Sequence, residues 1–121
     1  MRPVSRSSVS ITERGKRGER RAEDFFRLRG FEVLARNYRK LSGEIDLVLR
    51  KDGIIYFVEV KTHNDTFRAE DRIDDRKLRR MWLTAEAYLS EYGMEDVEVR
   101  FLLTTVSEKG IKVVEINEGP V

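Results

Sequence analysis

Cysteine is absent from this chain of 121 residues, and histidine occurs only once, at position 63. The lack of cysteine excludes a disulfide framework, a cysteine-ligated zinc site and a thiol nucleophile, and the single histidine excludes a multi-histidine metal site. No apolar stretch is long enough for a transmembrane helix or for the hydrophobic segment of a secretory signal. We therefore expect a cytoplasmic protein that does not contact a membrane.

A strong charge imbalance is also absent, because the formal net charge is only +2 although 38% of the residues are charged. This balance does not indicate binding of a polyanion through bulk positive charge, so any such contact has to come from local clusters. The length suits one domain with a single core. We predict a flexible N-terminal arm at residues 1–11, a single domain at residues 12–117 and a tail at residues 118–121.

The hydrophobic pattern predicts two helices and five strands in the order α-β-β-β-α-β-β, which is an α/β fold with a mixed β-sheet flanked by helices. A basic connector, residues 39–43, precedes the second strand, and a polar loop at residues 62–73 precedes the second helix. The predicted helices begin near Thr12 or Glu13 and near Asp74 or Asp75, and end at Arg29 and Tyr92. The predicted strands are Phe31–Tyr38, Gly43–Leu49, Ile54–Lys61, Val97–Val106 and Ile111–Ile116.

A hairpin is predicted around Asp52-Gly53, because both residues tolerate the positive φ angles of a two-residue turn. Lys51 then opposes Ile54, and the same register places Asp46 opposite Glu59 and Glu44 opposite Lys61. Strand alternation sorts the side chains into two faces. The polar face contains Glu44, Asp46, Glu59 and Lys61, and the apolar face contains Ile45, Leu47, Leu49, Tyr56, Val58 and Val60.

Two opposed carboxylates repel each other by roughly 3 kcal/mol at a Cβ separation of about 5 Å and an effective dielectric constant of about 20. A divalent cation removes this cost, and Mg²⁺ is usually held by one or two carboxylates together with water and substrate phosphates. The spacing of Asp46 and Glu59 therefore predicts a site for a hard cation. Two alternatives stay open: a solvated sheet face with a Glu44–Lys61 ion pair, and a three-residue loop whose bulge shifts the register.

Charged residues on the two predicted helices have two interpretations each. Glu19 lies at the edge of the apolar stripe of the first helix, either facing the hairpin or exposed near the helix start, where the helix dipole favours an acid. The second helix begins with a cluster that either binds phosphates or forms a solvated face. This cluster consists of Arg76, Lys77, Arg79 and Arg80.

Four segments, in this order and spacing, resemble the YraN-like family, which is placed within the PD-(D/E)XK nuclease superfamily. The resemblance covers nearly the whole chain after the first dozen residues. It implies a restriction-endonuclease-like αβββαβ core. The four segments are Gly15-Lys16-Arg17-Gly18-Glu19-Arg20-Arg21-Ala22, Ala35-Arg36-Asn37-Tyr38, Gly43-Glu44-Ile45-Asp46-Leu47 and Phe57-Val58-Glu59-Val60-Lys61-Thr62.

The resemblance also implies roles for individual residues. Asp46 and Glu59 correspond to the acids that bind Mg²⁺ or Mn²⁺, and the backbone carbonyl of Val60 joins them. Lys61 corresponds to the lysine that positions or activates the attacking water. Glu19 matches a helix acid that several branches add to the site, as in the small archaeal Holliday-junction resolvases.

The function predicted from these residues is metal-dependent hydrolysis of phosphodiester bonds in DNA, which is favoured over RNA, with branched or recombination intermediates as the leading substrates. A homodimer is compatible with this function. The alternative is a nucleic-acid-binding or scaffolding module that keeps the nuclease-like fold but has little or no turnover. Under either hypothesis, contacts to the nucleic acid are predicted for Arg39, Lys40, Arg76, Lys77 and Arg80.

Overall fold

The computed structural model describes residues 11–63 and 73–116. The predicted arm, apart from Ile11, the predicted tail and most of the predicted polar loop lie outside these residues. No helix within the described ranges is both long enough and apolar enough to cross a membrane.

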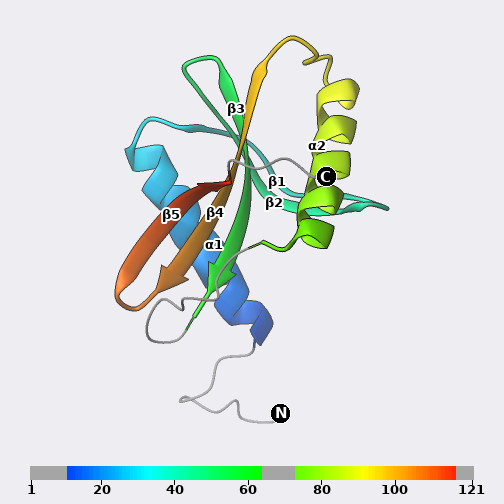
Figure 1. Ribbon diagram of the computed structural model, residues 1–121. Coiled ribbons are helices and arrows are strands. Elements are labelled where there is room, and N and C mark those ends of the chain that lie inside the picture. The colour runs from blue at the N-terminus through cyan, green and yellow to red at the C-terminus, as the bar shows by residue number, and fades with distance from the viewer. Residues whose placement is uncertain (1–10, 64–72, 117–121) are drawn as a thin grey trace, which may run out of the picture.

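The element order is the one predicted, with two helices and five strands (Figure 1). Most of the predicted basic connector, residues 39–43, belongs to the first two strands. Only Leu41-Ser42 forms a turn between these strands. Asp74 caps the second helix by accepting a hydrogen bond from the backbone of Lys77, as expected for an aspartate at that position. The elements are α1 (Ile11–Leu28), β1 (Glu32–Lys40), β2 (Gly43–Lys51), β3 (Ile54–Thr62), α2 (Asp75–Glu91), β4 (Glu98–Ser107) and β5 (Gly110–Ile116).

The five strands form one mixed sheet in the order β1-β2-β3-β4-β5. The β3–β4 pair is parallel and is connected through α2, whereas the other three pairs are antiparallel. A parallel pair requires such a crossover, because its strands run in the same direction. The predicted α/β class with a mixed sheet is therefore confirmed, and the architecture is compatible with a restriction-endonuclease-like core.

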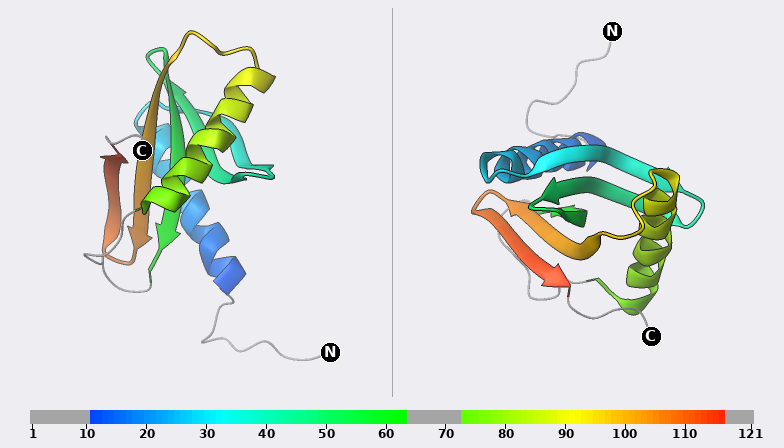
Figure 2. Two further views of the ribbon diagram at one scale, coloured as in Figure 1. Left: turned by 45° about the vertical axis from the view of Figure 1, so that its right-hand side comes forward. Right: turned by 90° about the horizontal axis from the view of Figure 1, so that it is seen from above.

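Each face of the curved sheet is covered by one helix (Figure 2). On one face, α1 contributes Ala22 and Phe26 to a buried cluster that includes Leu47, Leu49 and Val58. The cluster on the other face combines residues of α2 with residues of the sheet. Its buried members are Ile45, Val48, Ile55, Phe57, Met81, Ala85, Tyr88 and Phe101.

The Asp52-Gly53 turn has the predicted conformation, with φ angles of 53° and 79°. The predicted hairpin register is confirmed from Lys51 opposite Ile54 to Leu47 opposite Val58. Beyond that pair the β2–β3 ladder ends, so the predicted backbone pairs of Asp46 with Glu59 and of Glu44 with Lys61 do not form.

The predicted apolar face is confirmed for five of its six residues, which pack together on the α1 side: Leu47, Leu49, Tyr56, Val58 and Val60. Ile45 instead lies on the α2 side with Val48, and that face is not the predicted polar one, because apolar residues of the sheet are buried there as well. Leu47, two residues after Ile45, lies on the α1 side. Side-chain alternation is thus interrupted at Asp46. Asn37 lies between the partners of these two residues on β1 and has a φ angle of 49°, outside the range of a regular strand.

Candidate functional site

Asp46 lies at the point where β2 and β3 separate. Its Oδ2 accepts a hydrogen bond of 2.7 Å from the backbone N–H of Val60. The carboxylate therefore replaces the backbone partner that Val60 lacks beyond the end of the ladder. Because the N–H and C=O of one strand residue point to the same neighbouring strand, the Val60 carbonyl also faces the Asp46 side.

Glu59 lies on the α2 side of β3 and is almost completely buried, with 8% of the residue exposed. Its Oε2 is 2.6 Å from Nζ of Lys77, in the first turns of α2. A cavity of about 220 Å³ contains both this ion pair and Asp46. The cavity is lined by Gly43, Glu44, Asp46, Glu59, Lys77, Arg80 and Met81.

The surroundings of Asp46 raise the pKa of its carboxyl group to about 8. Burial is the largest cause, and the negative charges of Glu59, Glu19 and Glu44 add to it, while the hydrogen bond from Val60 opposes it. Burial and the neighbouring acids both disfavour the charged carboxylate. The site thus contains a carboxyl group that a nearby positive charge would convert to its ionised form.

Glu19 of α1 reaches the same region from the opposite side of the sheet. The amide of Asn37 donates to Glu19 at 3.2 Å and to Glu44 at 3.1 Å, so it bridges an acid of α1 and an acid of β2. Glu19 and Asn37 line a second cavity, of about 450 Å³, together with Asp46. Asp46 therefore borders the cavities on both sides of the sheet.

The position of α1 over this cavity is fixed by Glu23, one turn after Glu19. Its carboxylate accepts two hydrogen bonds of 2.6 Å from Arg36 of β1 and one of 2.9 Å from Arg27. These contacts, above all the one with Arg36, lower the pKa of Glu23 to about 2. A bidentate arginine–carboxylate pair defines orientation as well as distance.

The donors around Asp46 fit a hard divalent cation. Asp46, Glu59 and the Val60 carbonyl provide only oxygen atoms, and Mg²⁺ or Mn²⁺ commonly completes such a set with water. Within the described residues, no group of three or more acidic, histidine or cysteine side chains is arranged to hold a metal ion. A metal here would therefore depend on the carbonyl and on water, and it would compete with Lys77 for Glu59.

Lys61 follows Val60 on β3 and is half-buried, opposite Thr105 of β4. In the described part of the chain, its ammonium group takes part in no ion pair, and Glu44 pairs instead with Arg39 at 3.4 Å. The Glu44–Lys61 ion pair considered above is thus absent from these residues. The proposed role of Lys61 on the reacting water stays a prediction.

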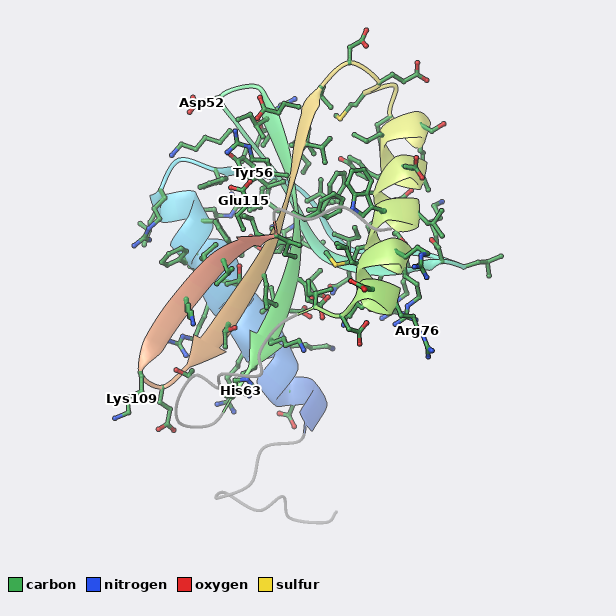
Figure 3. The ribbon with its side chains drawn as sticks, in the orientation of Figure 1. Asp52, Tyr56, His63, Arg76, Lys109 and Glu115 are labelled. Carbon is green, nitrogen blue, oxygen red and sulfur yellow. The ribbon has the colours of Figure 1, made fainter. Side chains whose placement is uncertain are left out.

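The three cations of α2 that were predicted to contact nucleic acid lie in different surroundings. Lys77 is inside the smaller cavity on Glu59, and Arg80 is exposed and lines the same cavity. Arg76 is exposed at the start of the helix and points away from the sheet (Figure 3). Arg80 and Arg76 are therefore accessible to a ligand, whereas Lys77 is engaged by an acid.

The two cations predicted on the β1 side are both exposed and both paired. Arg39 pairs with Glu44 at the border of the site. Lys40 pairs with Glu91 at 3.2 Å, near the C-terminal end of α2. The structure therefore places Arg39 beside the smaller cavity, which Glu44 lines, and does not bring Lys40 to it.

Asn37 is the site residue that the sequence analysis missed, although it lies in one of the four segments that carry the family resemblance. The sequence contained a signal for it, namely an asparagine inside a predicted strand, because asparagine is among the few residues that adopt positive φ angles readily. The contact of Lys77 with Glu59 had no local signal, since it joins residues 18 positions apart through the packing of α2.

Comparison with known sequences identifies the family. Residues 18–116 match the profile of the Uncharacterised protein family UPF0102. A UPF0102 protein of Pseudothermotoga lettingae is 39% identical over 97 residues, which are 80% of this chain and 91% of that protein. UPF0102 proteins of Kosmotoga olearia and Persephonella marina are 39% and 34% identical, over 81% of this chain and 85% and 86% of theirs. The chain belongs to the Uncharacterised protein family UPF0102, which is the YraN-like family.

Proposed function

We propose that this protein is a Mg²⁺- or Mn²⁺-dependent nuclease that hydrolyses phosphodiester bonds in DNA, with branched or recombination intermediates as the leading substrates. The observation that carries the proposal is the position of Asp46, whose carboxyl group shares one cavity with Glu59 and is hydrogen-bonded to the peptide of Val60. An acid held in this environment, with a raised pKa, is characteristic of functional sites.

The residues in and next to the cavity would have different roles in phosphodiester hydrolysis. Asp46, Glu59 and the Val60 carbonyl would hold the cation, which when bound lowers the pKa of water and neutralises charge on the scissile phosphate. Lys61, the next residue of β3, orients the attacking water and adds positive charge near the reacting phosphate. Arg80, at the border of the cavity, binds a phosphate oxygen of the substrate.

Glu19 acts on the α1 side of the site. Its hydrogen bond from Asn37 holds the carboxylate toward the cavity that Asp46 borders. If a cation is bound at Asp46, Glu19 would be placed to accept a hydrogen bond from one of its water molecules. This arrangement explains why an acid occupies a half-buried position on a helix that is otherwise basic around it.

A second function is favoured by the Lys77–Glu59 ion pair. Lys77 neutralises Glu59 without a metal, and this pairing is compatible with a binding module that has little or no turnover. Such a module would use the exposed cations of α2 to hold nucleic acid and would leave the phosphodiester bonds intact. Metal-dependent cleavage distinguishes the two functions.

The test is a cleavage assay on single-stranded, duplex and four-way-junction DNA with Mg²⁺, with Mn²⁺ and with EDTA. We expect the wild-type protein to cleave at least one substrate only with metal, and the Asp46→Asn variant to cleave none. Asp96→Asn is the matched control, since Asp96 is exposed in the connection between α2 and β4.

Cleavage that persists in EDTA or in the Asp46→Asn variant would refute the proposed mechanism. DNA binding by the wild-type protein, without cleavage of any of the three substrates, would establish the binding module instead.

A further inference from the structure

A third cavity, of about 200 Å³, lies between the first half of α1, the end of β3 and the turn that joins β4 to β5. It shares no lining residue with the two cavities around Asp46. We call it the α1–β3 cavity. Its lining residues are Arg17, Gly18, Arg21, Thr62, His63, Val106 and Glu108.

The cavity exists because α1 approaches the end of β3 very closely. Gly18 is buried at the contact, and a Cβ atom added there would lie 2.0 Å from Oγ1 of Thr62. This approach brings the residues on either side of the buried stripe, Arg17 and Arg21, beside Thr62 and His63. The backbone of His63 is itself fixed, because its N–H donates to the carbonyl of Val106 at 2.8 Å.

Arg21 is oriented toward the cavity by the neighbouring turn. Its Nη1 donates to the carbonyl of Ser107 at 2.9 Å. A guanidinium group has five N–H donors, so this contact holds the group in place and leaves most donors for a ligand. A fixed guanidinium group loses less conformational freedom when it binds than a free one does.

The charges around the cavity are mainly positive. Arg17 is exposed and, within the described ranges, takes part in no ion pair, while Glu108 is the one acid among the lining residues. Figure 3 shows His63 at the end of β3 and Lys109 at the nearby turn. Oxygen atoms of a phosphate group are among the ligands that arginine donors bind most strongly, through paired, charge-assisted hydrogen bonds.

The cavity is also placed along the strand that carries the proposed nuclease site. His63 follows Glu59 by four positions, which is a distance of about 13 Å along a β-strand. This length equals the rise of about four nucleotides along the axis of a duplex. Glu59 faces α2 and the cavity lies on the α1 side, so a nucleic acid whose scissile phosphate lies at Glu59 reaches the α1–β3 cavity by passing around the end of β3.

We propose that the α1–β3 cavity binds a backbone phosphate of the nucleic acid, through Arg17, Arg21 and His63, about four nucleotides from the scissile bond. This inference rests on the proposed function. It adds a phosphate contact on the α1 side of the site to those on α2, so that the substrate is held on both sides of the reacting bond.

The experiment measures DNA binding separately from cleavage. Fluorescein-labelled single-stranded and duplex 20-mers are titrated by fluorescence anisotropy with the Asp46→Asn variant, in which no cleavage is expected, over a series of NaCl concentrations. Arg17→Ala, Arg21→Lys and His63→Ala are added on this background. Arg100→Ala is the control, since it removes one positive charge at the opposite end of the sheet, where Arg100 pairs with Glu98.

We expect Arg17→Ala to weaken binding several-fold and to reduce the slope of log K against log [NaCl] by about 0.9 for duplex DNA and about 0.7 for single strands, as the loss of one phosphate contact does. Arg100→Ala should leave both quantities unchanged. Because Arg17 is exposed, its replacement is compatible with folding, which thermal melting verifies.

Two results would overturn the inference, and only the second of them would also overturn the proposed function. If the Asp46→Asn protein binds DNA and none of the three added substitutions changes the affinity or the slope, the α1–β3 cavity is a solvated surface and the proposed function stands. If neither this protein nor the wild type binds DNA, with or without Mg²⁺, the proposed function fails as well.

Discussion

At the residue scale, Asp46 connects the structure of the hairpin with the chemistry of the site. Its carboxyl group stands between the cavities on the two faces of the sheet and has three acids in its surroundings, Glu19, Glu44 and Glu59. A structural role does not require an acid here, because an asparagine oxygen accepts the hydrogen bond from Val60 equally well. The acid is therefore best explained by a ligand that favours its charged form.

The raised pKa of Asp46 predicts how the stability of the metal-free protein depends on pH. Because the pKa is about 8 in the folded chain and 3.8 for an unperturbed aspartate, protonation favours the folded state. This contribution is complete below about pH 4 and is lost as the pH rises to about 8. The free energy of unfolding of Asp46→Asn should equal that of the wild type at pH 4 and should be higher by roughly 2–5 kcal/mol at pH 9.

Urea denaturation of both proteins in EDTA, at several pH values between 4 and 9, measures this difference. Asp96→Asn serves as the control and should show no pH-dependent difference from the wild type. A stability difference that does not grow between pH 4 and pH 9 would contradict the proposed electrostatic origin.

Lys77 leads to a second prediction at this scale. Its ammonium group neutralises Glu59, and 37% of the lysine side chain but only 11% of the glutamate side chain is exposed. Lys77→Met keeps most of the aliphatic stem but removes the positive charge, which leaves the mostly buried carboxylate of Glu59 without a partner. The free energy of unfolding of the metal-free protein should therefore fall by about 1–3 kcal/mol. Mn²⁺ should then bind more tightly, because the competing cation is gone.

Thermal melting with and without Mn²⁺ tests this prediction beside Arg76→Met, which removes an exposed charge from the same turn. We expect a lower melting temperature for Lys77→Met in EDTA and a larger increase on addition of Mn²⁺ than in the wild type. A smaller increase would mean that Lys77 assists metal binding instead of opposing it.

At the scale of the elements, the angle between α1 and β3 depends on Gly18. Alanine favours a helix by about 0.5–1 kcal/mol relative to glycine, but its Cβ atom at position 18 would collide with the side chain of Thr62. Moving Thr62 or the helix should cost more than this gain, so we predict that Gly18→Ala destabilises the protein by about 1–3 kcal/mol.

Gly15 provides the matched control on the same helix, since a Cβ atom there has no neighbour within 4 Å. Gly15→Ala should therefore stabilise the protein by about 0.5–1 kcal/mol. Adding Thr62→Ala to Gly18→Ala should restore part of the loss, which a double-mutant cycle by urea denaturation quantifies. Additive effects of the two substitutions would show that the side chain of Thr62 does not collide with a Cβ atom at position 18.

The elements themselves follow from short-range patterns, which is why the sequence predicts them well. Asp52-Gly53 fixes the turn and thereby the register of the residues next to it, and Asp74 fixes the start of α2. The interruption at Asp46 was not predictable in this way. It depends on Asn37 of the neighbouring strand and on two helices that bury opposite faces, and a pattern within β2 contains none of this information.

At the scale of the whole molecule, both helices begin near the end of the sheet at which β3 ends (Figure 1). The α1–β3 cavity and the cavity around Glu59 therefore lie near the same end of the sheet. The net charge of the whole chain is only +2. Acids and bases balance over the chain but not over each surface, so the composition does not test the proposed contact with a polyanion.

The proposed ligands of the cation come together only in the folded molecule, because Asp46 and Glu59 lie on different strands. A cation that binds the folded state alone stabilises it by RT ln(1 + [L]/Kd), about 2.7 kcal/mol at a hundredfold excess over Kd. For a domain of this size, this stabilisation corresponds to an increase in melting temperature of roughly 10 °C. We expect this increase for the wild type with Mg²⁺ or Mn²⁺.

Two variants separate metal binding from catalysis in the same experiment. Asp46→Asn removes a ligand, so it should abolish both the metal-dependent increase in melting temperature and the cleavage. Lys61→Ala should keep the increase and lose cleavage, because Lys61 is proposed to act on the water and the phosphate and not on the cation. Differential scanning calorimetry with metal and with EDTA, beside the cleavage assay, measures both quantities. If the wild type shows no increase, or if Asp46→Asn retains it, the metal site is not the one described, and the binding module becomes the function that the structure supports.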